Sequence, residues 1–204
     1  MRKIFFGGSF DPVHIGHLVV ARDVLEELKP EKIIFVPAFQ APLKEPHQAT
    51  PQERFEMLSI ATEGVRGFEV SHMEIKRGGI SYTVDTAQEL FINFGERPTF
   101  LVGADSILSL HMWKQPQRLI RLAVFIIADR NKRAEDVRNY LRANFPELKE
   151  GRDFYILKTR NIDVSSTEVR NRVKEGKSIK WLVPESVESY ILEKGLYTKE
   201  QLRA

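Results

Sequence analysis

The sequence of 204 residues contains no cysteine, which excludes disulfide bonds and thiol chemistry. A protein without cysteine fits a reducing compartment, so we expect a cytoplasmic protein. Long hydrophobic runs are also missing. The longest, residues 122–128, is far shorter than the roughly 20 residues of a membrane-spanning helix. The apolar run near the start, residues 4–6, is too short for a secretory signal. The sequence therefore predicts no membrane partner.

Charge of one sign is in only slight excess. The formal net charge of +3 comes from 31 Lys and Arg against 28 Asp and Glu, spread along the chain. Such a charge suits anionic small molecules and does not favour a nucleic-acid partner. Repeats, low-complexity segments and linkers are missing, while 42% hydrophobic residues allow a sizeable core. We expect one domain over residues 1–204, and its oligomeric state, including a homo-oligomer, stays open.

Two common phosphate-binding patterns, GxGxxG and the Walker lysine loop, are absent as well. Instead, residues 7–18 read GGSFDPVHIGHL, between a predicted strand and a predicted helix. Two glycines let the backbone approach a ligand closely. His14 and His17 lie at the helix start, where unpaired N–H groups and the helix dipole favour an anion. We interpret this loop as a phosphate site.

A metal site is the alternative interpretation of the two histidines. Their spacing of three residues could serve a metal, but cysteine is absent and no third ligand is adjacent. Zinc is therefore not favoured, and we predict no metal held by protein ligands.

The run GGSFDPVHxGH resembles the signature of the nucleotidylyltransferase superfamily, whose HxGH motif handles the triphosphate of a nucleotide. The resemblance implies that His17 acts on the α-phosphate and that His14 helps to hold the phosphates, both as catalytic residues. A turn with two surface histidines is the alternative, which a match over twelve positions argues against. The ATP contacts implied in this loop are Gly7, Gly8, Ser9, Phe10, His14 and His17.

Residues 165–170, SSTEVR, resemble the second motif of the same superfamily, often written SSTxxR. The stretch offers a helix N-terminus, three hydroxyls and an arginine one turn later. The resemblance implies that Ser165, Ser166, Thr167 and Arg170 grip the β- and γ-phosphates, with Arg170 as a third catalytic residue. An ordinary capping box with Glu168 is the alternative, and this stretch alone would favour it.

Two further stretches resemble segments of nicotinate-mononucleotide adenylyltransferases. In residues 81–86, SYTVDT, the resemblance implies that Tyr82, Thr83 and Thr86 bind the mononucleotide. A carboxylate suits the N–H groups of a helix start. A helix cap is the alternative for this stretch.

The second of these stretches is Gly103-Ala104-Asp105, followed by Trp113. The resemblance implies that Gly103 and Asp105 meet ATP, with Asp105 at ribose hydroxyls, and that Trp113 stacks on the nicotinate ring. A flat, electron-poor ring suits an indole face. Core packing is the alternative for Trp113.

Where the family carries Pro-Pro-His-Lys after the second strand, this chain reads Ala41-Pro42-Leu43-Lys44. The resemblance implies that Lys44 binds substrate, and Leu43 removes the histidine contact. The closing pattern of residues 191–197, ILEKGLY, also resembles the nicotinate branch.

Strand and helix patterns alternate along most of the chain, which predicts an α/β fold: a doubly wound, Rossmann-like parallel sheet with helices on both faces. Ligands bind such sheets at the carboxyl ends of the strands. From about residue 165 we expect a helical C-terminal segment. The expected strands are 4–6, 33–36, 68–70 with a possible extension over 73–75, 99–102, 123–128 and 154–157. The expected helices include 51–62, 84–94, 134–145, one opening after Ser165, and 185–194.

Taken together, the resemblance implies an adenylyltransferase that joins ATP to nicotinate mononucleotide. Mg²⁺ would be the cofactor, bound through the ATP phosphates. Phosphopantetheine adenylyltransferase shares the first motif, but residues 81–83 and Trp113 argue against it. A non-catalytic nucleotide-binding regulatory module is the alternative from another class. The intact His14, His17 and Arg170 argue against that alternative.

Overall fold

The computed structural model describes residues 3–42 and 45–199. Within these residues six strands form one sheet in the order β3-β2-β1-β4-β5-β6, and every neighbouring pair is parallel. The predicted doubly wound parallel sheet is therefore confirmed. The strands are β1 (Lys3–Gly8), β2 (Lys32–Pro37), β3 (Phe68–Val70), β4 (Thr99–Gly103), β5 (Val124–Asp129) and β6 (Phe154–Lys158).

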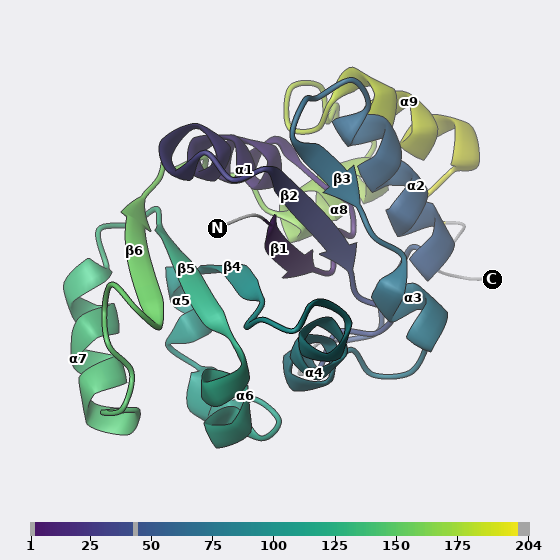
Figure 1. Ribbon diagram of the computed structural model, residues 1–204. Helices are drawn as coiled ribbons and strands as arrows, with labels where there is room; N and C mark the ends of the chain where they lie inside the picture. Colours follow the sequence, from purple (N-terminus) through teal and green to yellow (C-terminus); the bar gives the residue numbers. More distant parts are fainter. Residues whose placement is uncertain (1–2, 43–44, 200–204) are drawn as a thin grey trace.

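Helices cover both faces of the sheet (Figure 1). Neighbouring residues of β1, Ile4 and Phe5, enter two different hydrophobic clusters, as the alternation of side chains along a strand requires. One face carries α1 (Ile15–Leu28), α2 (Pro51–Thr62), α8 (Ser166–Lys174) and α9 (Glu185–Lys194). The other carries α4 (Thr83–Phe94), α5 (Ala104–Ile107), α6 (Pro116–Leu122) and α7 (Ala134–Asn144). No helix among the described residues is both long and apolar enough to cross a bilayer.

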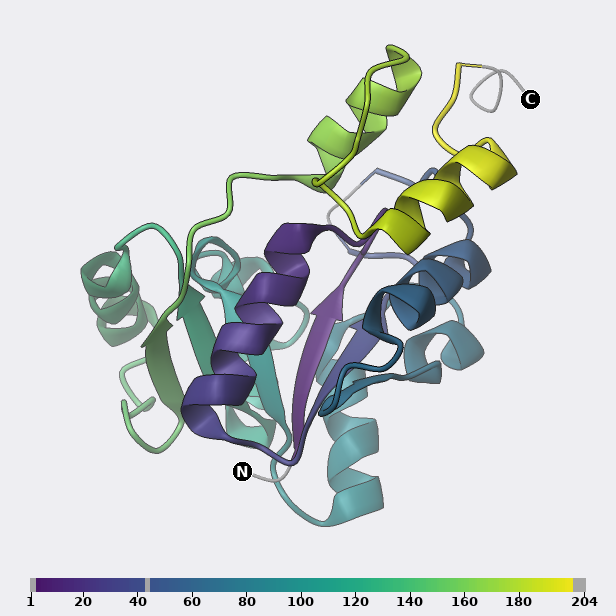
Figure 2. The same ribbon diagram turned by 90° about the horizontal axis from the view of Figure 1, so that it is seen from above.

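The strand order reverses direction at β1, which has β2 on one side and β4 on the other. A crevice opens at such a point because the loops after the two central strands leave toward opposite faces. Helices α8 and α9 lie beyond the carboxyl end of β1, on the side toward which its arrowhead points (Figure 2). The fold thus brings these two helices, which come late in the chain, to the loop after its first strand.

The helix boundaries have local signals. Thr50 and Glu53 form a capping box at the start of α2, with Pro51 at its first position. Gly95 ends α4 and Gly195 ends α9, both in the left-handed conformation that glycine adopts without strain. The predicted helices 51–62 and 185–194 are confirmed, and α4 begins one residue before the predicted 84–94.

Two elements differ from the prediction. Residues 73–75 do not extend β3 but begin α3 (Met73–Arg77), whose first N–H, that of Met73, donates to Ser71 Oγ at 3.3 Å. The acidic side chain of Glu74 turns inward to polar partners, which an extension of the sheet would not provide. Helix α6 was not predicted, although Pro116 at its first position is a start signal.

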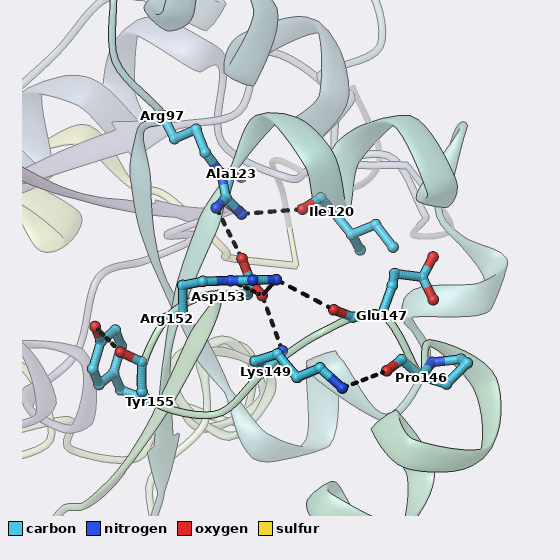
Figure 3. Close-up of polar contacts among 10 residues, drawn as sticks. Arg97, Ile120, Ala123, Pro146, Glu147, Lys149, Arg152, Asp153 and Tyr155 are labelled. Carbon is cyan, nitrogen blue, oxygen red and sulfur yellow. Dashed lines mark hydrogen bonds and ion pairs between the residues drawn. The ribbon is translucent and has the colours of Figure 1, made fainter.

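The amino end of the sheet is closed by a cluster of charges around Asp153, which directly precedes β6 (Figure 3). Arg97 Nη1 lies 2.9 Å from Asp153 Oδ1, and Arg97 Nη2 donates to the carbonyl of Ala123 before β5. Arg152 Nη2 and the N–H of Lys149 donate to Asp153 Oδ2 at 2.7 and 2.9 Å. Burial alone would raise the pKa of Asp153, but these donors outweigh it and lower the pKa to about 2.

Candidate active site

The loop after β1 gives its two glycines different tasks. A Cβ on Gly8 would lie 2.9 Å from the ring of Phe10, so Gly8 makes room for that ring, which is buried in the core. A Cβ on Gly7 would meet nothing within 4 Å. Backbone open to a ligand is therefore found at Gly7, while the side chain of Phe10 belongs to the core and only its backbone remains for the predicted contact.

The two histidines stack on each other at the start of α1, with ring centroids 3.7 Å apart. The N–H of His14 donates to His17 Nδ1 at 3.2 Å, which assigns the proton of a neutral His17 ring to Nε2. Gly16 is needed between them, because a Cβ there would lie 3.0 Å from the ring of His14. The HxGH spacing is thus explained by packing as well as by chemistry.

His14 is almost fully buried, and its charge state follows from that burial. Burial, and then the positive charge of Arg130, lower the pKa of His14 to about 4. At neutral pH the ring is therefore neutral and offers one N–H rather than a positive charge. Its Nδ1 has no hydrogen-bond partner within the described residues. A buried nitrogen left unpaired at a helix start suits a ligand.

Arg130, which the sequence analysis missed, directly follows β5 at the carboxyl end of the sheet. It lies near Gly103, because a Cβ on that glycine would be 3.9 Å from Arg130 Nη2. The same guanidinium acts on the pKa of His14. The available signal was its position after a buried strand, which is where the other predicted loops begin.

The second predicted motif meets the first directly. Ser166 Oγ donates to the carbonyl of Pro12 at 2.9 Å, and Arg170 Nη1 donates to the carbonyl of Asp11 at 2.7 Å, across more than 150 residues of sequence. Arg170 Nη2 reaches Thr167 Oγ1 at 3.3 Å, and its buried Nε has no partner within the described residues. The two stretches predicted to bind phosphate are therefore in direct contact and can form a single site.

Ser165 has the cap role that was the alternative for this motif. Its Oγ accepts a hydrogen bond from the N–H of Glu168 at 3.1 Å, at the start of α8. Capping and ligand binding are compatible here, because a capped helix still presents its first N–H groups.

Tyr82, Thr83 and Thr86, which are predicted to bind the mononucleotide, lie at the start of α4, on the other face of the sheet. Lys114 links them: its Nζ lies 4.3 Å from the ring centroid of Tyr82 and 3.0 Å from Asp85 Oδ2. The adjacent Trp113 follows the short helix η1 (Leu110–Met112), is half-buried against the second hydrophobic cluster, and donates from Nε1 to Ser109 Oγ at 3.3 Å.

Thr86 already has polar partners for its hydroxyl. The hydroxyl donates to Glu74 Oε1 and accepts from Arg77 Nη2 at 2.7 Å, and the residue is buried. Burial raises the pKa of Glu74, and the bond from Thr86 partly offsets this effect. The N–H of Thr86 is also engaged, donating to the carbonyl of Tyr82 at 3.3 Å, so the N–H groups that this helix start offers to a ligand are those of Thr83 and Val84.

The phosphate side and the α4 side are joined through Arg54, a fully buried residue of α2 that the sequence analysis missed. Arg54 Nη1 donates to Ser9 O at 2.7 Å and Nη2 donates to Phe39 O at 2.8 Å. The N–H of Phe39 in turn donates to Ser81 Oγ at 2.9 Å. The signal was an arginine four residues before the buried Leu58, on the inner stripe of a helix.

Two predicted site residues are not brought into these contacts. Asp105 is exposed in α5, and its Oδ1 accepts from Arg133 Nη1 at 2.7 Å. A ribose at Asp105 would share the carboxylate with that arginine. Lys44 lies outside the described residues.

Comparison with known proteins identifies the family of this chain. Over residues 5–172 the chain matches the family described as cytidylyltransferase-like. It is 47% identical to a probable nicotinate-nucleotide adenylyltransferase of Aquifex aeolicus, over 81% of this chain and 99% of that protein. This chain belongs to the nicotinate-nucleotide adenylyltransferase family. A second member, from Hydrogenobaculum sp., is 42% identical over 96% of this chain and 97% of its own length.

The fold agrees with the solved structure of a Plasmodium falciparum nicotinic acid mononucleotide adenylyltransferase complexed with NaAD. The TM-score is 0.78 at 20% identity, over 97% of this chain and 98% of that one. At this identity the likeness concerns the fold. Membership of the nicotinate-nucleotide adenylyltransferase family confirms the resemblance stated for residues 81–86 and for Gly103-Ala104-Asp105 with Trp113.

Proposed function

We propose that this chain transfers AMP from ATP to nicotinate mononucleotide, giving nicotinate adenine dinucleotide and pyrophosphate. The observation that carries the proposal is the pair of hydrogen bonds from Ser166 and Arg170 to the loop after β1, which makes one phosphate site of two distant stretches. The names of the relatives support the substrate, and the α4 side offers it a place.

The proposed chemistry is an in-line displacement. A phosphate oxygen of the mononucleotide attacks the α-phosphorus of ATP, and the bond from that phosphorus to the bridging oxygen of pyrophosphate breaks. His17 donates its Nε2 proton in a hydrogen bond to an α-phosphate oxygen, where negative charge develops. Such a transfer depends on positioning and charge stabilisation, so no covalent nucleophile is needed.

The β- and γ-phosphates, which leave as pyrophosphate, are bound by the second motif. Two sets of donors serve this binding. One is Arg170 Nε, which is buried and has no partner within the described residues, and the other is the N–H groups at the start of α8. Arginine suits phosphate because its planar fork matches two oxygens. The neutral His14 adds one donor without adding charge.

Mg²⁺ fits this site only through the nucleotide. The described residues contain no group of three or more His, Cys, Asp or Glu that could hold a metal, whereas ATP phosphates and water supply oxygen ligands. When bound in this way, Mg²⁺ neutralises phosphate charge. The chain's own contribution is to hold the phosphates with the residues named above.

The pyridine ring is proposed to lie against Trp113 with its carboxylate toward the first N–H groups of α4, at Thr83 and Val84. These groups favour an anion, whereas the NH₂ of an amide would face donors with a donor. Leaving buried donors unpaired costs about 1–3 kcal/mol, so we expect a preference of roughly ten- to a hundredfold for the acid over the amide.

The test is pyrophosphate release from ATP and Mg²⁺ with each of three acceptors: nicotinate mononucleotide, nicotinamide mononucleotide and phosphopantetheine. We expect release with the first above all. Equal use of the two mononucleotides would contradict the carboxylate argument alone. Release with phosphopantetheine only would replace the substrate, and nucleotide binding without any release would indicate a regulatory module.

A further inference from the structure

The loop after β1 is held by Asp11, a buried residue to which the proposed chemistry gives no role. Asp11 Oδ2 accepts from the N–H of Gln48 at 2.9 Å, and Oδ1 accepts from the N–H of Ala49 at 3.1 Å and from the hydroxyl of Tyr197 at 2.8 Å. Its main-chain carbonyl accepts from Arg170. Four segments therefore meet at one residue: the loops after β1 and β2, helix α8, and the stretch after α9.

Tyr197 is the most distant of these partners, 186 residues from Asp11. It belongs to the closing pattern GLY of residues 195–197, has no exposed surface, and adopts a left-handed backbone with φ of 63°. Such a conformation is uncommon for a bulky residue and persists only where its surroundings impose it. Burial, and then the charge of Asp11, raise the pKa of its hydroxyl. Tyr197 therefore stays protonated at neutral pH and donates its hydrogen bond to Asp11.

The segment just before α9 contacts the start of the HxGH helix. The N–H of Ile15, the first residue of α1, donates to the carbonyl of Leu182 at 2.9 Å. Arg54 and Arg170 both lie close enough to Tyr197 to lower the pKa of its hydroxyl in part. The segments on both sides of α9 therefore contact the loop and the helix that carry the HxGH motif.

We infer that Tyr197 is a positioning residue for the triphosphate: through Asp11 it fixes the carbonyl that orients Arg170, and so it sets the affinity for ATP. The inference rests on the proposed function and adds a part of the chain to it. It predicts a larger effect on ATP than on the acceptor, because Asp11 bonds directly to Arg170, whereas the α4 side is linked to this cluster indirectly, from Arg54 through Phe39 to Ser81.

The chain offers a matched control in Tyr190, seven residues earlier in α9. The hydroxyl of Tyr190 also donates to a carboxylate, that of Glu56 on α2, but neither residue belongs to the site. Tyr190→Phe and Tyr197→Phe each remove one hydroxyl and one bond to a carboxylate. Only Tyr197→Phe removes a bond that leads to Arg170.

The experiment measures kcat and KM with ATP and nicotinate mononucleotide varied in turn. We expect Tyr197→Phe to raise KM for ATP about three- to tenfold, the range for one hydrogen bond, with KM for the mononucleotide changed less than about twofold. Tyr190→Phe should leave both constants within about twofold. In an Arg170→Lys background, Tyr197→Phe should change KM for ATP less than it does alone, because the two residues act through one contact.

Three results would overturn the inference: an unchanged KM for ATP, equal changes for both substrates, or the same changes in Tyr190→Phe. If Tyr197→Phe does not fold, Asp11→Asn replaces it and should show the same ATP-specific effect. Failure of both to fold would make the cluster structural only. Calorimetric titration with ATP alone separates this inference from the proposed function, since weaker ATP binding by Tyr197→Phe is expected whichever acceptor the enzyme uses.

Discussion

The two ends of the sheet treat buried polar groups in opposite ways. At the amino end, Asp153 forms ion pairs with Arg97 and Arg152 and accepts a backbone N–H bond, so its charge is paired within the chain. At the carboxyl end, His14 and Arg170 each keep a buried nitrogen without a partner within the described residues. Arg97 Nε is also unpaired, but the guanidinium to which it belongs faces a carboxylate.

This difference separates stability from binding. A buried charge with all its partners in place is costly to break up and has nothing left for a ligand. A buried donor without a partner costs stability until a ligand arrives. We therefore expect substitutions at the carboxyl end to lower activity more than stability. Substitutions at the amino end should lower stability more than activity.

The largest expected effect is that of His17→Ala on turnover. Removing one donor placed where charge develops lowers kcat on the order of 10²–10³-fold. The fold should remain, because the half-buried ring of His17 packs against His14, Phe6 and Phe10 at the edge of the core. Turnover and thermal unfolding of the purified variant check both statements. Turnover near that of the wild type would remove His17 from the mechanism.

Asp153→Ala should give the opposite result at the other end. It leaves the half-buried Arg97 and the N–H of Lys149 without their acceptor, and a hydrogen bond to a charged group contributes about 1.5–3 kcal/mol of unfolding free energy. Denaturant unfolding measures the loss, and kcat at a temperature where the variant is folded should match the wild type. Glu150→Ala is the control. Its pair with Arg138 at 2.9 Å is exposed, so its loss should change stability much less.

Much of the carboxyl end could be predicted because its signals are local. The GGSFDPVHIGH loop lies between a strand pattern and a helix pattern, and the capping residues near Thr50 and Ser165 mark helix starts. Parallel strands then place the loops at one edge without further information. The meeting of the two motifs is implied by the resemblance and not by the fold class, because β6, which precedes the second motif, lies three strands away from β1.

What could not be predicted are the side-chain partners across long separations. Nothing near Asp11 indicates that Tyr197 is its partner, and nothing near Arg54 indicates the carbonyls of Ser9 and Phe39. The strand proposed over 73–75 was wrong because Met, Glu and Ile alternate as a half-buried strand would. Only the contact of Glu74 with Thr86 decides for a helix there.

Acid titration should separate the two ends by pH. The folded pKa of His14 is about 4, below its ordinary 6.5, so between these values the unfolded chain binds a proton that the folded chain does not. The free energy of unfolding should therefore decrease as the pH is lowered from 6.5 to 4, by up to ~3 kcal/mol. Above pH 6.5 the contribution of His14 should be constant.

The contribution of Asp153 has its own window. Its folded pKa of about 2 lies below the ordinary 3.8, so its stabilisation is present above 3.8 and is lost as pH falls toward 2. Denaturant unfolding at pH 7, 5 and 4 tests the first window, and His14→Gln should flatten the slope there. Equal slopes in both proteins would contradict the burial argument for His14.

The smallest expected effect concerns Trp113, which distinguishes stacking on a ligand from core packing. The chain has two tryptophans, and Trp181 is 80% exposed on the opposite face. In Trp181→Phe, all indole fluorescence comes from Trp113. Adding nicotinate mononucleotide should quench it, because an electron-poor ring stacked on indole accepts its excitation. An aromatic pair is worth about 0.5–1.5 kcal/mol, so Trp113→Ala should raise KM for both mononucleotides about two- to tenfold, with their ratio unchanged. Unquenched emission together with an unchanged KM would leave Trp113 as part of the second hydrophobic cluster, and the carboxylate preference would then depend on α4 alone.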